Sequence, residues 1–122
     1  MAQIVHAGRT ETKVVVAFDI RWQGDLSGGR SVTWSMTVTS PDGRDSVRLA
    51  YQLLDGASAE QFVLDRASGR RQDVDPDADL DGDEITVRFP TASVGVAATW
   101  PSWRAVITVD GEDVAERLLT LG

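Results

Sequence analysis

Acidic residues are concentrated in one short segment whose spacing is that of a cation-binding loop. Residues 72–84 read QDVDPDADLDGDE and hold seven of the 19 acidic residues of the chain, with no basic residue among them. Ca²⁺ needs several oxygen ligands converging on one point, and a glycine allows the tight bend that brings them together. The residues at loop positions 1, 3, 5, 6 and 7 would be Asp77, Asp79, Asp81, Gly82 and Asp83.

The match to a helix-loop-helix calcium site fails further along the segment. Glu84 stands at position 8, where an apolar residue is usual, and Arg88 stands at position 12, where a bidentate Glu is required. The simplest interpretation is a solvated hairpin turn, and a patch that docks a basic partner is another. The functional alternative is a weak divalent-cation loop within residues 75–84, because a bound cation would relieve the repulsion among the aspartates. Its predicted metal ligands are Asp77, Asp79, Asp81, Asp83 and Glu84.

Aromatic residues are the second group of candidates. Trp22 and Trp34 fall at inward positions of predicted strands and are interpreted as core residues. Trp100 lies at the mouth of an apolar connection, and Trp103 begins the next strand. Aromatic side chains at one end of a β domain can line a small-molecule pocket, so we predict ligand binding at Trp100 and Trp103 with Tyr51 as a hydrogen-bond donor. The alternative for Trp100 is a plug over the core.

Catalytic signatures are scarce in this sequence. It has no Cys and a single His, so thiolate chemistry, disulfides and multi-histidine metal sites are excluded, and no nucleophile elbow, P-loop or dinucleotide motif is present. We therefore lean towards a non-enzymatic protein without a required cofactor. A small β-barrel cyclase or isomerase with an apolar pocket stays open, as does an assembly protein that uses a sheet edge. Arg66, Arg70 and Arg71 surround a turn and are interpreted as a solvated hairpin tip, with a phosphate or carboxylate contact as the functional alternative.

The net charge of −7 is a local property. Without the seven acids of residues 72–84, the chain has 12 acidic and 12 basic residues. A negative balance argues against capture of nucleic acid or anionic membranes. No apolar run approaches the ~20 residues of a membrane helix, and the first residues lack the features of a signal peptide, so we expect a cytoplasmic protein.

Period-two alternation of apolar residues dictates the elements that must position these side chains. Residues 31–39 read SVTWSMTVT, the pattern of a half-buried strand, and similar sets recur along the chain between turns such as Asp55-Gly56 and Asp110-Gly111. The spacing predicts one all-β domain over residues 1–122. Its architecture would be an antiparallel β-sandwich or a flattened up-and-down β-barrel of about eight or nine strands, mostly connected as a meander.

Three segments need separate interpretation. Residues 113–121 fit a helix or the second arm of a hairpin, and we favour the strand. The apolar connection 90–102 is expected to form a helical turn or to cover one end of the core, and residues 24–30, GDLSGGR, are expected to be a flexible loop.

The function we predict is a binding module that recognises a small ligand or a protein partner. Its site would lie at the loop end that carries Trp100 and the acidic segment, and oligomerisation through a sheet edge is a further expectation. The strand pattern, with Phe89-Pro90 and the stretch Trp103–Gly111, is similar to many bacterial β-sandwich binding modules without pointing to one family.

Overall fold

Ten strands and two short helical segments make up the computed structural model, which describes residues 2–26 and 29–120. The first five strands are β1 (Gln3–Glu11), β2 (Val15–Gln23), β3 (Ser31–Thr39), β4 (Ser46–Leu54) and β5 (Ala57–Asp65). The last five are β6 (Arg70–Asp73), β7 (Ala78–Asp81), β8 (Glu84–Pro90), β9 (Ser102–Val109) and β10 (Glu112–Thr120). The helical segments are α1 (Thr91–Val94) and the 3₁₀ helix η1 (Gly95–Thr99), both between β8 and β9.

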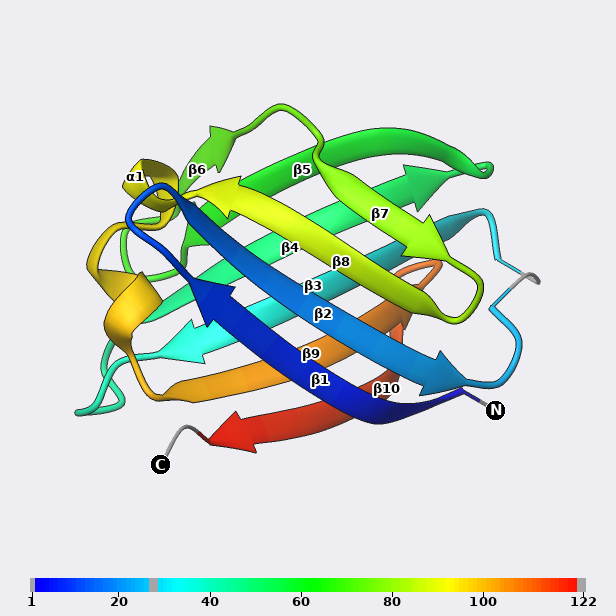
Figure 1. The fold of residues 1–122 in the computed structure, drawn as a ribbon, viewed down its shortest axis with the longest axis horizontal. Helices are drawn as coiled ribbons and strands as arrows, with labels where there is room; N and C mark the ends of the chain where they lie inside the picture. Colours follow the sequence, from blue (N-terminus) through cyan, green and yellow to red (C-terminus); the bar gives the residue numbers. More distant parts are fainter. Residues whose placement is uncertain (1, 27–28, 121–122) are drawn as a thin grey trace.

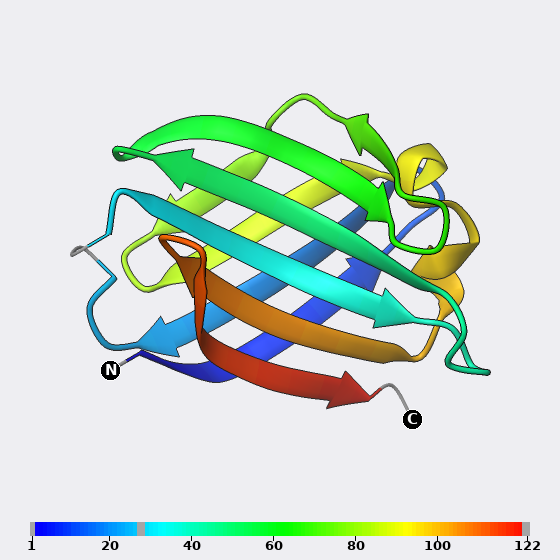
Figure 2. The same cartoon turned by 180° about the vertical axis from the view of Figure 1, so that it is seen from behind.

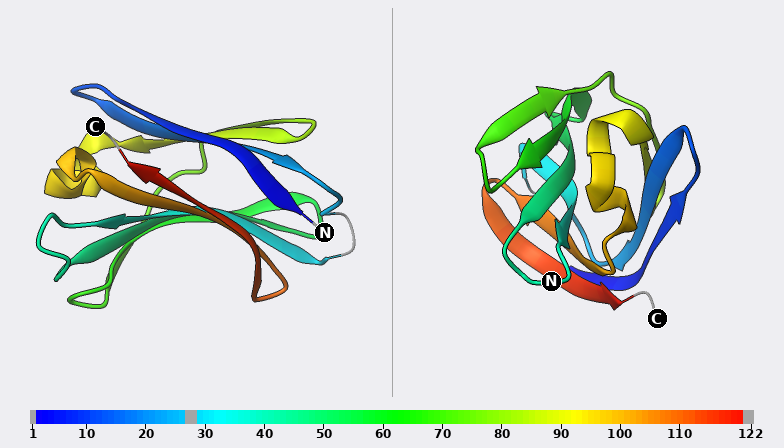
Figure 3. Two further views of the ribbon diagram at one scale, coloured as in Figure 1. Left: turned by 90° about the horizontal axis from the view of Figure 1, so that it is seen from below. Right: turned by 90° about the vertical axis from the view of Figure 1, so that its left-hand side faces the viewer.

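The strands form a β-sandwich, which confirms the predicted fold class. One sheet has four strands in the order β1-β2-β8-β7, and the other has six in the order β10-β9-β3-β4-β5-β6 (Figures 1 and 2). Figure 3 shows the two sheets as stacked layers, with the helical segments at one end. The two sheets do not close into a barrel.

The connectivity departs from the expected meander at two places. Consecutive strands pair within hairpins, but β2 also pairs with β8, and β3 pairs with β9. The chain passes between the layers after β2, β6 and β8. Both sheets are therefore assembled from segments that lie far apart in the sequence.

Side-chain alternation explains the core. In β3 the inward residues Val32, Trp34, Met36 and Val38 are buried, as their period-two spacing predicts. Apolar residues of β9, in the same sheet, and of β2 and β8, in the opposite sheet, pack with them in the core. Thr37 and Thr39 face outward and keep partial exposure.

The apolar connection closes one end of this core, as predicted. Val94 in α1 and Ala97 and Ala98 in η1 are buried and belong to the core cluster. The C-terminal segment is strand β10, which confirms the favoured interpretation over its described part. Residues 27 and 28 of the expected loop 24–30 and Leu121 lie outside the described residues. Among the residues described, none form a helix long and apolar enough to cross a membrane.

Gln61 forms hydrogen bonds between the two sheets on the side of the short edge strands β6 and β7. Its side chain is 1% exposed, although it belongs to β5 of the six-stranded sheet. Its Nε2 donates to the Arg88 carbonyl at 2.6 Å, and its Oε1 accepts from the Asp77 backbone N–H at 2.8 Å. Both partners belong to the β7–β8 side of the four-stranded sheet, so one amide satisfies backbone groups across the layers.

Candidate functional site

An apolar groove lies between the sheets at the end opposite the helical segments. Its volume is about 420 Å³, within the range of small-molecule sites, and it opens to solvent between the loops. We call it the tryptophan groove. The apolar residues that line it are Trp22, Leu26, Val32, Trp34, Leu53 and Leu80, and its remaining lining residues are Gly29, Arg30, Asp55, Gly56 and Gly82.

Two tryptophans from opposite sheets meet in this groove. Trp22 is near the end of β2 and Trp34 is in β3, and their ring centroids are 5.4 Å apart. Tyr51 is opposite Trp34 in the β3–β4 register and stacks on it with a centroid distance of 6.4 Å. The three rings form a continuous aromatic layer with Trp34 in the middle, and Trp22 and Trp34 line the groove.

The indole N–H of Trp34 is buried without a hydrogen-bond partner among the described residues. Trp34 is only 2% exposed, so bulk water does not compensate for the missing bond. A buried donor without a partner costs about 1–3 kcal/mol, and such groups are rare in folded proteins. The groove therefore has an aromatic lining, and one of the residues that line it carries an unsatisfied donor.

Hydrogen bonds from neighbouring turns fix the rim of the groove. The Arg30 carbonyl accepts from the Asp55 N–H at 2.7 Å, and the side chains of the two residues form an exposed ion pair at 3.3 Å. Asp110 Oδ1 accepts from the backbone N–H groups of Arg30 and Ser31 at 2.9 and 3.0 Å. Asp55 and Asp110 both have positive φ and each precedes a glycine with positive φ, as in type I′ hairpin turns.

The β7–β8 turn completes the rim from the four-stranded sheet. The backbone N–H of Trp22 donates to the Asp83 carbonyl at 3.0 Å, which holds this turn against the end of β2. Leu80 in β7 is 47% exposed, although it is apolar and lines the groove. An exposed leucine at the mouth of an aromatic groove provides a surface that an apolar ligand can cover.

The predicted ligand residues are divided between two ends of the molecule. Trp103 is 1% exposed, and its Nε1 donates to the Trp100 carbonyl at 2.8 Å. The Arg9 guanidinium lies 4.6 Å from the Trp103 ring centroid and donates to the Ala98 carbonyl. Burial lowers the pKa of Arg9, and nearby Glu11 opposes that effect. Trp100 is half-buried at this closed end, whereas Tyr51 is buried beneath Trp34 at the tryptophan groove.

The acidic segment extends along the sandwich without joining Trp100. The turn at Asp81–Glu84 is at the groove end of the sandwich, opposite α1 and η1 (Figure 1). The turn at Asp81–Glu84 and Trp100, which follows η1, therefore lie at opposite ends of the sandwich, whereas Gln72 at the start of the segment donates to Ser93 Oγ of α1 at 3.1 Å. Trp22, Trp34 and Leu80 are groove residues that sequence reasoning did not assign to a site, because it interpreted the two tryptophans only as core residues. The available signal was Trp22 at the end of a strand, next to the glycine-rich loop.

Two of the predicted metal ligands have basic partners. Arg88 contacts Asp79 at 2.7 Å and Asp77 at 3.3 Å. The hydrogen bond and charge of Asp79, followed by the contribution of Asp77, raise the pKa of Arg88 above its ordinary value. Within the two described ranges, 2–26 and 29–120, no three acidic or histidine side chains form a group that could hold a metal ion.

The cation loop at Asp77, Asp79, Asp81, Asp83 and Glu84 stays a prediction that calorimetric titration with Ca²⁺ tests. If the loop binds, we expect heat of binding and a higher melting temperature at millimolar Ca²⁺, since the cation would screen the aspartates from one another. Asp81→Asn should reduce both responses, and Asp45→Asn, in the β3–β4 turn, should not. Absence of heat together with an unchanged melting temperature would contradict the loop.

Comparison of the chain with protein-family models, with curated proteins and with solved structures finds no match.

Proposed function

We propose that the protein is a non-enzymatic binding module that takes a small, largely apolar ligand with one hydrogen-bond acceptor into the tryptophan groove. The observation that carries this proposal is the buried indole N–H of Trp34, which has no hydrogen-bond partner in the described part of the chain. A ligand oxygen or nitrogen that reaches this donor would remove its desolvation cost, and the aromatic walls would supply most of the contact area.

The shape of the groove supports a small ligand as the occupant. A volume of about 420 Å³ is enough for a one- or two-ring compound. Trp22 and Trp34 supply flat faces, and partly exposed Leu80 supplies an apolar edge. Among the described residues that line the groove, the charged side chains are those of Arg30 and Asp55, which pair with each other at the rim. An uncharged ligand therefore fits this lining better than an ion.

Acetophenone and α-methylstyrene form a matched pair of probes for this proposal. They have nearly the same shape, but only acetophenone has a carbonyl acceptor. We expect both to shift the resonances of groove residues in ¹H–¹⁵N NMR spectra and only acetophenone to move the Trp34 indole N–H downfield. The Trp34→Phe variant identifies that signal by removing it. It should weaken the binding of acetophenone about three- to tenfold more than the binding of α-methylstyrene, which is the contribution of one neutral hydrogen bond.

Two surface variants locate the binding. Leu80→Ser at the groove mouth should weaken the binding of both probes. Val96→Ser changes a more exposed apolar residue, in η1 at the opposite end, and should leave the binding of both probes unchanged. If Trp34→Phe weakens the binding of both probes equally, the indole N–H of Trp34 does not bind the ligand acceptor. Shifts centred on Trp100, or no saturable shifts at all, would contradict the proposed site.

A further inference from the structure

The outer face of the six-stranded sheet contains a second buried polar group without a partner. Ser35 faces away from the core, because it alternates with the inward residues Trp34 and Met36. An outward hydroxyl normally meets water, yet Ser35 is 1% exposed and its Oγ has no hydrogen-bond partner among the residues that the structure describes. Because Ser35 is on a central strand and also lines an outer groove of about 410 Å³, it forms the floor of that groove.

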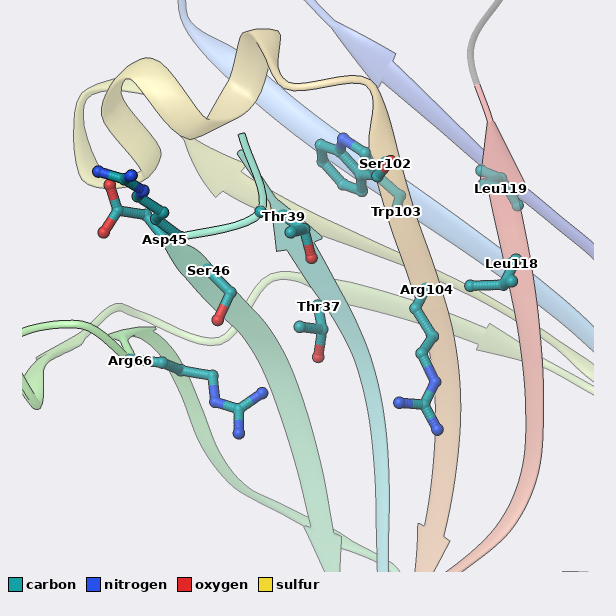
Figure 4. Close-up of a pocket in the computed structure, with 12 residues that line it drawn as sticks. Thr37, Thr39, Asp45, Ser46, Arg66, Ser102, Trp103, Arg104, Leu118 and Leu119 are labelled. Carbon is teal, nitrogen blue, oxygen red and sulfur yellow. The ribbon is translucent and has the colours of Figure 1, made fainter. Parts of the chain in front are cut away.

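Two arginines flank Thr37, the outward residue next to Ser35 on β3, because of the strand register. Thr37, the next outward residue of β3, is paired with Arg48 of β4 on one side and with Arg104 of β9 on the other. Adjacent strands are about 4.8 Å apart, so these two arginines begin about 10 Å from each other across Thr37. Arg66, which follows β5, is the third. Figure 4 shows Arg66 and Arg104 on either side of Thr37.

We call this site the arginine groove. It is lined by two apolar residues and by the polar and charged residues Ser35, Thr37, Arg48, Arg66, Arg104 and Asp113.

The charges of the arginine groove are incompletely balanced. Arg104 pairs with Glu116, whereas Arg48 and Arg66 form no side-chain ion pair or hydrogen bond with the described residues. Asp113 lines the groove and accepts a hydrogen bond from Thr108 Oγ1 at 2.8 Å. Three guanidinium groups thus face two carboxylates, in a chain whose net charge is −7.

Another arginine on the same face of the sheet, Arg71, is fully paired with carboxylates. Arg71 contacts Glu60 at 2.6 Å and Asp73 at 2.8 Å, and its guanidinium lies 3.9 Å from the Phe62 ring centroid. Its hydrogen bonds to the two carboxylates raise the pKa of Arg71. Arg48 and Arg66 lack such partners within residues 2–26 and 29–120, although the chain has 19 acidic residues.

We propose that the arginine groove binds a phosphate group, with the guanidinium groups of Arg48, Arg66 and Arg104 and the hydroxyl of Ser35 as its ligands. Guanidinium groups present planar, forked donors that match the oxygens of phosphate. The Ser35 hydroxyl donates from the floor, and a tetrahedral anion has enough oxygens for donors arriving from several directions. This surface is separate from the tryptophan groove, because Ser35 and Trp34 point to opposite faces of β3.

NMR titration with inorganic phosphate at low ionic strength tests the site, with phenyl phosphate as a second arm. We expect saturable shifts of the Ser35 and Thr37 amides at millimolar phosphate. Arg48→Gln and Arg104→Gln should each weaken binding about tenfold or more, the loss of one charge-assisted hydrogen bond. Ser35→Ala should weaken binding less. Tighter binding of phenyl phosphate would identify an organic phosphate ester as the ligand class, and tighter binding of the inorganic ion would identify free phosphate.

Arg21→Gln, on the outer face of the four-stranded sheet, is the matched control and should bind phosphate as the unchanged protein does. Chloride at equal ionic strength should not produce the same shifts. No saturable shift, or equal losses in Arg21→Gln and Arg48→Gln, would overturn the proposal. Melting temperatures of all variants show that each is folded during the titration. Acetophenone binding is measured on the same samples, so the two sites succeed or fail separately.

Discussion

Trp103→Ala is expected to lower the free energy of unfolding by about 3–5 kcal/mol, the range for removing a large buried aromatic side chain. Trp103 is 1% exposed and fills the core beneath the helical segments. The substitution would also remove the Trp103 hydrogen bond to the Trp100 carbonyl and leave the Arg9 guanidinium over a cavity. Urea denaturation followed by circular dichroism measures the change, provided that unfolding is two-state.

Trp100→Ala is the matched control, because it removes the same side chain three residues earlier at the same end of the sandwich. Trp100 is half-buried, and its carbonyl, which accepts from Trp103, belongs to the backbone and remains. Its loss of stability should be clearly smaller. Comparable losses for both variants would show that Trp100 is as much a part of the core as Trp103, and would contradict the burial-based ranking.

Gln61→Leu is expected to lower the free energy of unfolding by about 2–4 kcal/mol, although it makes the interior more apolar. Leucine has nearly the size of glutamine, so little cavity forms. The Arg88 carbonyl and the Asp77 N–H would each lose a buried partner, at about 1–3 kcal/mol per group before any water reaches them. Urea denaturation gives the free energy, and hydrogen exchange at Asp77 should accelerate.

Gln52→Leu in the neighbouring strand β4 is the control for this prediction. Gln52 faces the outer side of the sheet and is only half-buried, so the same chemical change should alter stability by no more than about 0.5 kcal/mol. If Gln61→Leu were equally mild, the amide of Gln61 would not be a significant link between the sheets.

Local pattern was sufficient to predict the strands and the covered end of the core. Strand β3 follows the alternation of residues 31–39 without exception at its inward positions, and the connection 90–102 packs against the core as its apolar composition indicates. These features depend on residues close in the sequence. The pairing of strands that lie far apart in the sequence does not depend on nearby residues. For that reason the predicted meander was only partly right.

The acidic segment shows what register adds to a motif. Arg88 stands where a calcium loop requires a glutamate, and the structure pairs this arginine with Asp77 and Asp79. A hairpin that turns at Asp81–Glu84 places Asp79 opposite Thr86, and by the same count Asp77 opposite Arg88. This contact was accessible from the sequence by counting outward from the turn, whereas the meeting of Trp22 with Trp34 required knowledge of both sheets.

The pairing of β2 with β8 and of β3 with β9 also has a kinetic consequence. Val15 pairs with Pro90, and Val32 pairs with Val109. Each sheet is therefore complete only after the long segment between the paired strands has lost conformational entropy. Proteins dominated by such distant contacts fold on a timescale of about milliseconds to seconds. The β3–β4–β5 hairpins can form early, but the tryptophan groove exists only once both sheets are joined. Any ligand that binds there recognises the finished native state and none of the partly folded chains that precede it.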